Sequence, residues 1–198
     1  MVDNRNYLVH PHYIAMGLLL IGVSSLFIGF SASYIYSRVQ FDLEPLHVPL
    51  LFIINTGILI SSSVVLGYSM RCYKADETRR YQISLGVTLF LTILFLVSQI
   101  IAWQDLYNQG IFVNHGNMAS YLYLISFVHF AHVIVGIPFL ALFLYTSIKK
   151  MKEPVSVLVY FSDPDKKRKL KLLTIYWHFL DILWIYLVVF FLVNSFIK

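Results

Sequence analysis

The last apolar run of the chain, Leu172–Ile197, carries an ionisable pair inside a segment that is long enough to cross a bilayer. A helix rises about 1.5 Å per residue, so roughly 20 apolar residues span the roughly 30 Å of hydrocarbon. Asp181 is therefore expected near membrane depth, where a lone carboxylate costs about 2.5 to 3.5 kcal/mol. His178 precedes it by one helical turn, so we expect both side chains on one face, with Trp177 and Trp184 forming an aromatic stripe beside them.

Composition indicates a membrane protein, because 59% of the 198 residues are hydrophobic and 13% are charged. Five long apolar segments and their connections occupy nearly the whole chain, which leaves no room for a separate soluble domain. The polar N-terminal segment has neither an apolar core nor a cleavage site, so no removable signal peptide is expected. The sequence predicts an all-α fold, a single membrane domain of five transmembrane helices. These cover residues 13–37, 48–70, 81–104, 118–148 and 172–197.

Positive charge is distributed unequally between the connections. Thirteen of the 15 lysines and arginines lie in the N-terminal segment and in the second and fourth connections; the other two are Arg38 and Lys198. Positively charged connections stay in the cytoplasm, so we expect a cytoplasmic N-terminus and an outside C-terminus. The basic cluster Lys166–Lys171, beside the last helix, is expected to attract anionic headgroups and not nucleic acid.

Histidines on two predicted helices provide further candidate functional groups. His129 and His132 lie one turn apart, which repeats the spacing of His178 and Asp181. A carboxylate-bridged metal centre would need acids from several helices, and the chain has no second membrane-embedded acid. The spacing of these histidines does not distinguish axial haem ligands from histidines that are hydrogen-bonded between helices. The preferred interpretation is a buried polar cluster that joins the fourth and fifth predicted helices, with no catalytic residue, metal or cofactor in this chain.

Two more histidines, His10 and His12, flank Pro11 at the predicted cytoplasmic entry to the membrane. Histidine titrates near neutral pH, so the pair is a candidate proton antenna. The alternative interpretation is that both are ordinary solvated side chains at the interface.

Two sequence motifs resemble those of subunit III of haem-copper respiratory oxidases. Residues 176–184, YWHFLDILW, resemble the last-helix signature of that family, roughly YWHFVDVVW. Residues 129–133, HFAHV, together with Gly136, resemble its HxxHV…G helix. Weaker landmarks at Asn55, Thr56 and Gln99 extend the resemblance over nearly all of the chain, which resembles the five-helix form of the family that lacks the first two helices.

The resemblance implies a non-catalytic, cofactor-free subunit of a proton-pumping cytochrome c oxidase in a bacterial cytoplasmic membrane. Haem and copper would lie in partner subunits, and catalysis would belong to subunits I and II. Subunit I would be the main contact, and the chain would bind phospholipid and support proton uptake. The family's membrane-embedded acids align with Val23 and Ala102, so any role assigned to those acids is not carried over.

Two alternatives remain at the sequence level. The closer one is subunit III of a quinol oxidase or of a nitric oxide reductase, because the electron donor binds to other subunits. The more distant one is a small membrane transporter whose path includes His129, His132 and Asp181. Five helices without inverted-repeat symmetry argue against that transporter.

Overall fold

The computed structural model of the chain describes residues 10–41, 49–113 and 117–196. Six helices form it: α1 (Pro11–Phe41), α2 (Leu50–Lys74), α3 (Thr78–Asn108), α4 (Asn117–Lys150), α5 (Pro154–Ser162) and α6 (Pro164–Phe196). Among the described residues, five of these helices, all except α5, are long and apolar enough to cross a membrane. The predicted all-α fold with five membrane-crossing helices is confirmed.

The helix boundaries differ from the sequence prediction mainly before the last helix. α6 begins at Pro164, eight residues before the predicted start at residue 172, so the basic cluster belongs to a helix and not to a connection. Proline suits the first position of a helix because the backbone N–H that it lacks would have no partner there. The Asp163 carboxylate accepts hydrogen bonds from the backbone N of Asp165, at 2.9 Å, and of Lys166, at 3.3 Å, which caps the new helix end.

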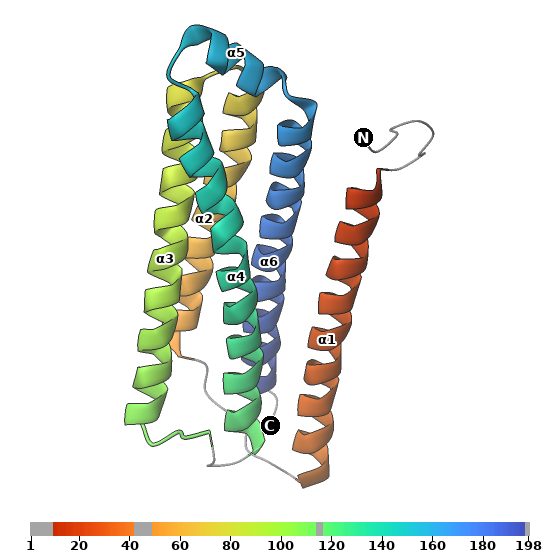
Figure 1. Cartoon of the computed structure of the whole chain (residues 1–198). Helices are drawn as coiled ribbons and strands as arrows, with labels where there is room; N and C mark the ends of the chain where they lie inside the picture. Colours follow the sequence, from red (N-terminus) through yellow and green to blue (C-terminus); the bar gives the residue numbers. More distant parts are fainter. Residues whose placement is uncertain (1–9, 42–48, 114–116, 197–198) are drawn as a thin grey trace.

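The short helix α5 also lies in the segment that was predicted to be a connection. It buries Tyr160 and Phe161 against the ends of α2 and α3, where Tyr73 donates a hydrogen bond to the backbone oxygen of Tyr160 at 3.0 Å. Figure 1 shows α5 lying across one end of the bundle. The predicted helix ends at Val48 and Ile197 lie outside the described residues.

Four long helices form the body of the bundle, and α1 lies at its side (Figure 1). α2 and α3 form a hairpin, while α4 and α6 pack against them. One buried apolar cluster surrounds Phe95 and Trp184, and a second surrounds Tyr81 and Trp177 near α5. The two large indole side chains of α6 therefore belong to different cores, Trp184 to the first and Trp177 to the second.

α4 and α6 approach each other closely at Gly136. A Cβ atom built on this glycine would lie 2.8 Å from Cζ3 of Trp177, so no larger residue fits without a shift. α4 has 34 residues, with Pro138 inside it. Its length of about 51 Å exceeds the roughly 30 Å of hydrocarbon, so α4 is tilted or extends beyond the hydrocarbon.

α1 is attached to the bundle near its C-terminal end. Arg38 donates a hydrogen bond to the backbone oxygen of Asn194 at 2.7 Å, and the Tyr34 ring lies edge-on to Phe190, with centroids 5.3 Å apart. Ser33 shares a hydrogen bond with a tyrosine of α4 at 2.8 Å. Toward its start α1 diverges from the other helices (Figure 1).

Candidate functional site

The seam between α6 and α2 is made of polar side chains at membrane depth. Three residues of α6, spaced along the face that meets α2, each reach a hydroxyl group on that helix. The three bonds join Trp177 Nε1 to Ser62 Oγ (3.3 Å), His178 Nδ1 to Ser63 Oγ (2.5 Å) and Trp184 Nε1 to Thr56 Oγ1 (3.1 Å). Hydroxyl and indole groups buried in hydrocarbon need such partners, so the seam fixes the register of α6 against α2.

Asp181 lies next to this seam and is 4% exposed. Neither carboxyl oxygen has a hydrogen bond of good geometry to a described residue, although Ser63 interacts with the carboxyl group. The sequence pairs Asp181 with His178 on one helix face; in the structure both lie beside the same serine of α2.

His129 and His132 differ from the expected polar joint between α4 and α6. The His129 ring is fully buried between Phe95 and Trp184, with ring centroids 6.1 and 4.9 Å away, and neither ring nitrogen bonds a described residue. The His132 Nδ1 atom lies 2.7 Å from a backbone oxygen one turn earlier in α4. His129 thus meets α6 by ring packing, and the ionisable side chains of α4 and α6 are not hydrogen-bonded to one another in the described structure.

Sequence reasoning missed the residues that do join these helices. The Tyr176 hydroxyl donates to the backbone oxygen of His132 at 2.9 Å, and Gly136 admits Trp177. Ser62 and Ser63 of α2, which contact α6, are recognisable in the sequence only as hydroxyl groups that can bond across a helix interface.

Sequence spacing indicates the helix face on which such a residue lies, but not which neighbouring helix that face meets.

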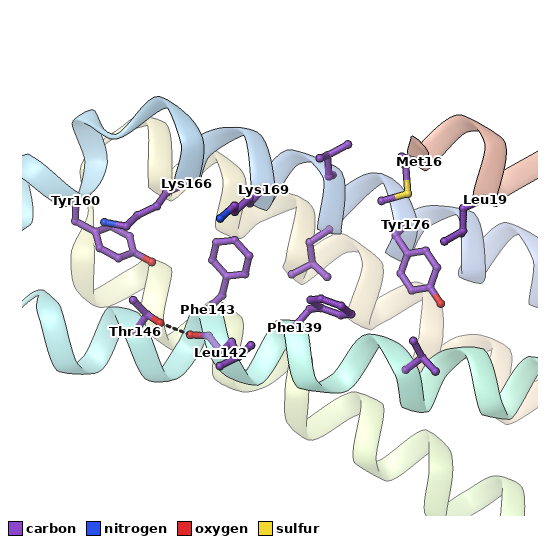
Figure 2. A pocket seen from close by; sticks show the side chains of 13 residues that line it. Met16, Leu19, Phe139, Leu142, Phe143, Thr146, Tyr160, Lys166, Lys169 and Tyr176 are labelled. Carbon is purple, nitrogen blue, oxygen red and sulfur yellow. Dashed lines mark hydrogen bonds between the residues drawn. The ribbon is translucent and has the colours of Figure 1, made fainter. Parts of the chain in front are cut away.

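A pocket of about 690 Å³ opens between α1, α4, α5 and α6 (Figure 2). Its walls are mostly apolar: Phe139, Leu142 and Phe143 come from α4, Leu172 and Leu173 from α6, and Met16 and Leu19 from α1. Lys166 and Lys169 line the end near α5, away from Met16, Leu19 and Tyr176 (Figure 2). The pocket therefore combines an apolar body with a positive end.

The positive end of this pocket is ordered by local contacts. The ammonium group of Lys166 lies 4.2 Å from the centre of the Tyr160 ring and 3.4 Å from a carboxylate oxygen of Asp163. A neighbouring pocket of about 520 Å³ shares Lys166 and adds Lys149 and Lys150. Lysine ammonium groups from α4 and α6 are therefore available at this end of the pocket to bind one anionic group of a ligand.

His10 and His12 lie near the same end of the molecule. Arg168 of α6 donates a hydrogen bond to His10 Nε2, and the Nδ1 atoms of the two histidines are 2.9 Å apart. Burial, and then the positive charges of Arg168 and His12, lower the pKa of His10 below its ordinary value. Neutral His10 is therefore favoured, and its contact links the start of α1 to α6.

The comparisons with known proteins identify the family of the chain. Residues 38–195 match the family described as cytochrome c oxidase subunit III. The chain belongs to this family. A cytochrome c oxidase subunit 3 of Thermostichus vulcanus is 30% identical over 90% of the chain, and the match spans 86% of that relative.

Two other subunit III relatives differ in their named oxidase. A probable quinol oxidase subunit 3 of Staphylococcus saprophyticus is 25% identical over 73% of the chain and 66% of the relative. A cytochrome c oxidase subunit 3 of Danio rerio is 29% identical over 74% of the chain, which spans half the length of that relative. A subunit III is one member of an oxidase complex, so this membrane protein has partner subunits.

Two positions where the subunit III resemblance places acids are apolar here. Val23 is 9% exposed and Ala102 is fully buried, and both belong to the core around Trp184. The described structure accommodates these two side chains by apolar packing.

Proposed function

We propose that the chain is the non-catalytic subunit III of a proton-pumping terminal oxidase in a bacterial cytoplasmic membrane. In this proposal it stabilises the catalytic subunit I, contacts subunit II, binds phospholipid and supports proton uptake. Haem and copper belong to the partner subunits. Family membership and the membrane-crossing helices support the general role, and the pocket between α1, α4 and α6 supports the lipid.

The pocket is the observation that carries the lipid-binding proposal. In this proposal an acyl chain would lie along Phe139, Leu142 and Leu172, and an anionic headgroup at Lys166 and Lys169, all of which line the pocket. The apolar walls provide a surface on which an acyl chain can pack, and each lysine near a headgroup contributes about 1 kcal/mol. α1 closes one side, so bound lipid would hold α1 against the bundle.

The test is the lipid content of the intact oxidase, purified gently through a tag on another subunit. The variant replaces Lys166 and Lys169 by glutamine. The control replaces two exposed cations, Lys74 at the end of α2 and Arg79 at the start of α3, by glutamine. We expect several-fold less phospholipid per haem in the variant and no change in the control. Equal lipid content in both would contradict binding at this pocket.

The electron donor is a separate question within the proposal. Cytochrome c is the donor named by the relatives from Thermostichus vulcanus and Danio rerio, and quinol is the alternative named by the Staphylococcus saprophyticus relative. We propose cytochrome c because the relative from Thermostichus vulcanus covers the larger share of both chains. Oxidation of reduced cytochrome c, but not of quinol, by the purified complex is the expected result.

A further inference from the structure

His178 lies on the outward side of α6 although it is inside the membrane-crossing segment. It is half-buried, and Ile182 and Ile185, one and two turns further along, are 66% and 37% exposed on the same face. The apolar run begins at Leu172, so His178 lies about 9 Å along the helix from the edge of that run. The half-buried imidazole ring of His178 is therefore accessible from outside the helix bundle.

Among the described residues, a hydrogen-bond partner is found for one of the two ring nitrogens of His178. Nδ1 is bonded to Ser63 of α2 at 2.5 Å. Nε2 has no hydrogen bond to a described residue and is not enclosed by the bundle. Gly67 of α2 lies close to this nitrogen: a Cβ atom built on it would be 3.8 Å from Nε2, so no side chain at this position covers the ring.

The free nitrogen needs a polar partner, because hydrocarbon offers neither donors nor acceptors at this depth. The side of α2 that borders it runs from Ile60 through Ser63 to Gly67, at helical spacing. Together with His178, Ile182 and Ile185 of α6, these residues form a surface that we call the α2–α6 face. A glycine beside an unpaired polar group is the combination that transmembrane helix contacts use, since close approach and hydrogen bonding drive association there.

We propose that the α2–α6 face docks a transmembrane helix of another oxidase subunit, which supplies a hydrogen-bonding side chain to His178 Nε2. This inference rests on the proposed function, because it takes the partner from the oxidase complex. The exposed isoleucines supply the packing surface, Gly67 gives the helix room, and Ser63 holds the ring in place through Nδ1. A lipid acyl chain would leave Nε2 without a partner, so lipid is the less favourable occupant.

Retention of the chain by the oxidase tests this docking surface. The complex is purified through a tag on a haem-bearing subunit, and the ratio of this chain to haem is measured after a detergent wash. Gly67→Leu fills the face, and His178→Asn keeps a polar group near Nδ1 but removes the group at Nε2. The matched control is Gly86→Leu on α3, outside the α2–α6 face, where a Cβ atom would meet nothing within 4 Å. We expect Gly67→Leu to lower retention at least tenfold, His178→Asn several-fold, and the control not at all.

A photo-crosslinking residue at Ile182 keeps the proposal testable if a variant fails to fold. The control position is Phe90 of α3, which is 65% exposed. We expect Ile182 to crosslink to another oxidase subunit and Phe90 not to do so. Crosslinks from Ile182 only to lipid, or to a second copy of this chain, would overturn the docking proposal. If the wild-type chain fails to co-purify with any haem protein, the proposed function itself is contradicted.

Discussion

A methyl group added at Gly136 would lie 2.8 Å from Cζ3 of Trp177, so the Trp177 side chain of α6 packs directly against the backbone of α4. The same Trp177 side chain donates its indole hydrogen to Ser62 of α2 at 3.3 Å. One residue of α6 therefore sets the distance to two neighbouring helices. Substitutions at Gly136 or Ser62, which contact this indole, should therefore lower the stability of the whole bundle.

Gly136→Ala should destabilise the bundle by about 1 to 3 kcal/mol, because the methyl group forces the helices or the indole to shift. Thermal unfolding of the purified complex, followed through this chain, measures the effect. Gly86→Ala on α3 is the control, since its Cβ would meet nothing within 4 Å. A melting temperature that is equal in the two variants would contradict the close contact.

Trp177→Phe should cost on the order of 1 kcal/mol through the lost hydrogen bond, because it removes Nε1 and leaves the Ser62 hydroxyl buried without that donor. A double-mutant cycle with Ser62→Ala isolates the bond from the change in ring volume. We expect the tryptophan substitution to cost less in the Ser62→Ala background. Additive effects of the two substitutions would show that the indole contributes by packing alone.

The chain should have its N-terminus in the cytoplasm, because thirteen of its 15 basic residues occupy the connections and helix ends of one side. Cysteines are introduced at Gln109, after α3, or at Lys167, in the first turns of α6, with Cys72 replaced by serine. An impermeant thiol reagent added outside intact cells should label Gln109→Cys and miss Lys167→Cys. The reverse pattern would invert the topology.

The contact between His10 and Arg168 should be lost in acid. Burial, then Arg168 and His12, lower the pKa of His10, while Asp165 opposes this shift. Neutral His10 is thus favoured by the fold: the contact is fully formed above the ordinary histidine pKa of about 6.5 and is lost as the pH falls through the lowered value.

Spin labels can follow this contact by the distance between the start of α1 and the start of α6, with one label at Ile14 and one at Lys167. We expect the distance to lengthen in acid in the wild type and to be independent of pH in His10→Gln, whose amide oxygen accepts without titrating in this range. An equal response in the variant would assign the movement to another group.

The proton-antenna role of His10 and His12 needs a rate measurement in reconstituted vesicles. Replacing both by glutamine should slow proton uptake by the oxidase more than Val23→Ala does, because the variant removes both imidazole groups at the start of α1. Electron transfer in the first turnovers should stay normal. Unchanged uptake would leave the pair as ordinary interfacial side chains.

The membrane-crossing helices could be predicted because hydrophobic runs of sufficient length have one structural solution in a bilayer. The start of α6 was missed because Lys166–Lys171 was interpreted as a charged connection, although Asp163 and Pro164 form a recognisable helix start. The charges of Lys166–Lys171 indicate that this segment meets water, but they do not indicate whether it is helical. α5 was missed because its nine residues are too short for the hydrophobic pattern to identify.

The spacing of the candidate residues predicts which of them share a helix face, but it does not predict their partners on other helices. The spacing of His178 and Asp181 places both on one side of α6, which agrees with their common neighbour Ser63. The expected link from these residues to His129 was not found, because helical periodicity does not say which neighbour a face meets. The pocket was outside the reach of the sequence, since it depends on the divergence of α1 from α4 and α6.

α1 is tied to α6 by Arg38 near one end and separates from the other helices toward its start. Because the pocket lies along this divergence, a lipid bound there as proposed would enter it from the side, between α1 and the helices α4 and α6. Under the lipid-binding proposal, the lipid in the pocket would be drawn from the surrounding leaflet and would change with the composition of that leaflet. The oxidase would then hold a lipid from its own membrane among α1, α4, α5 and α6.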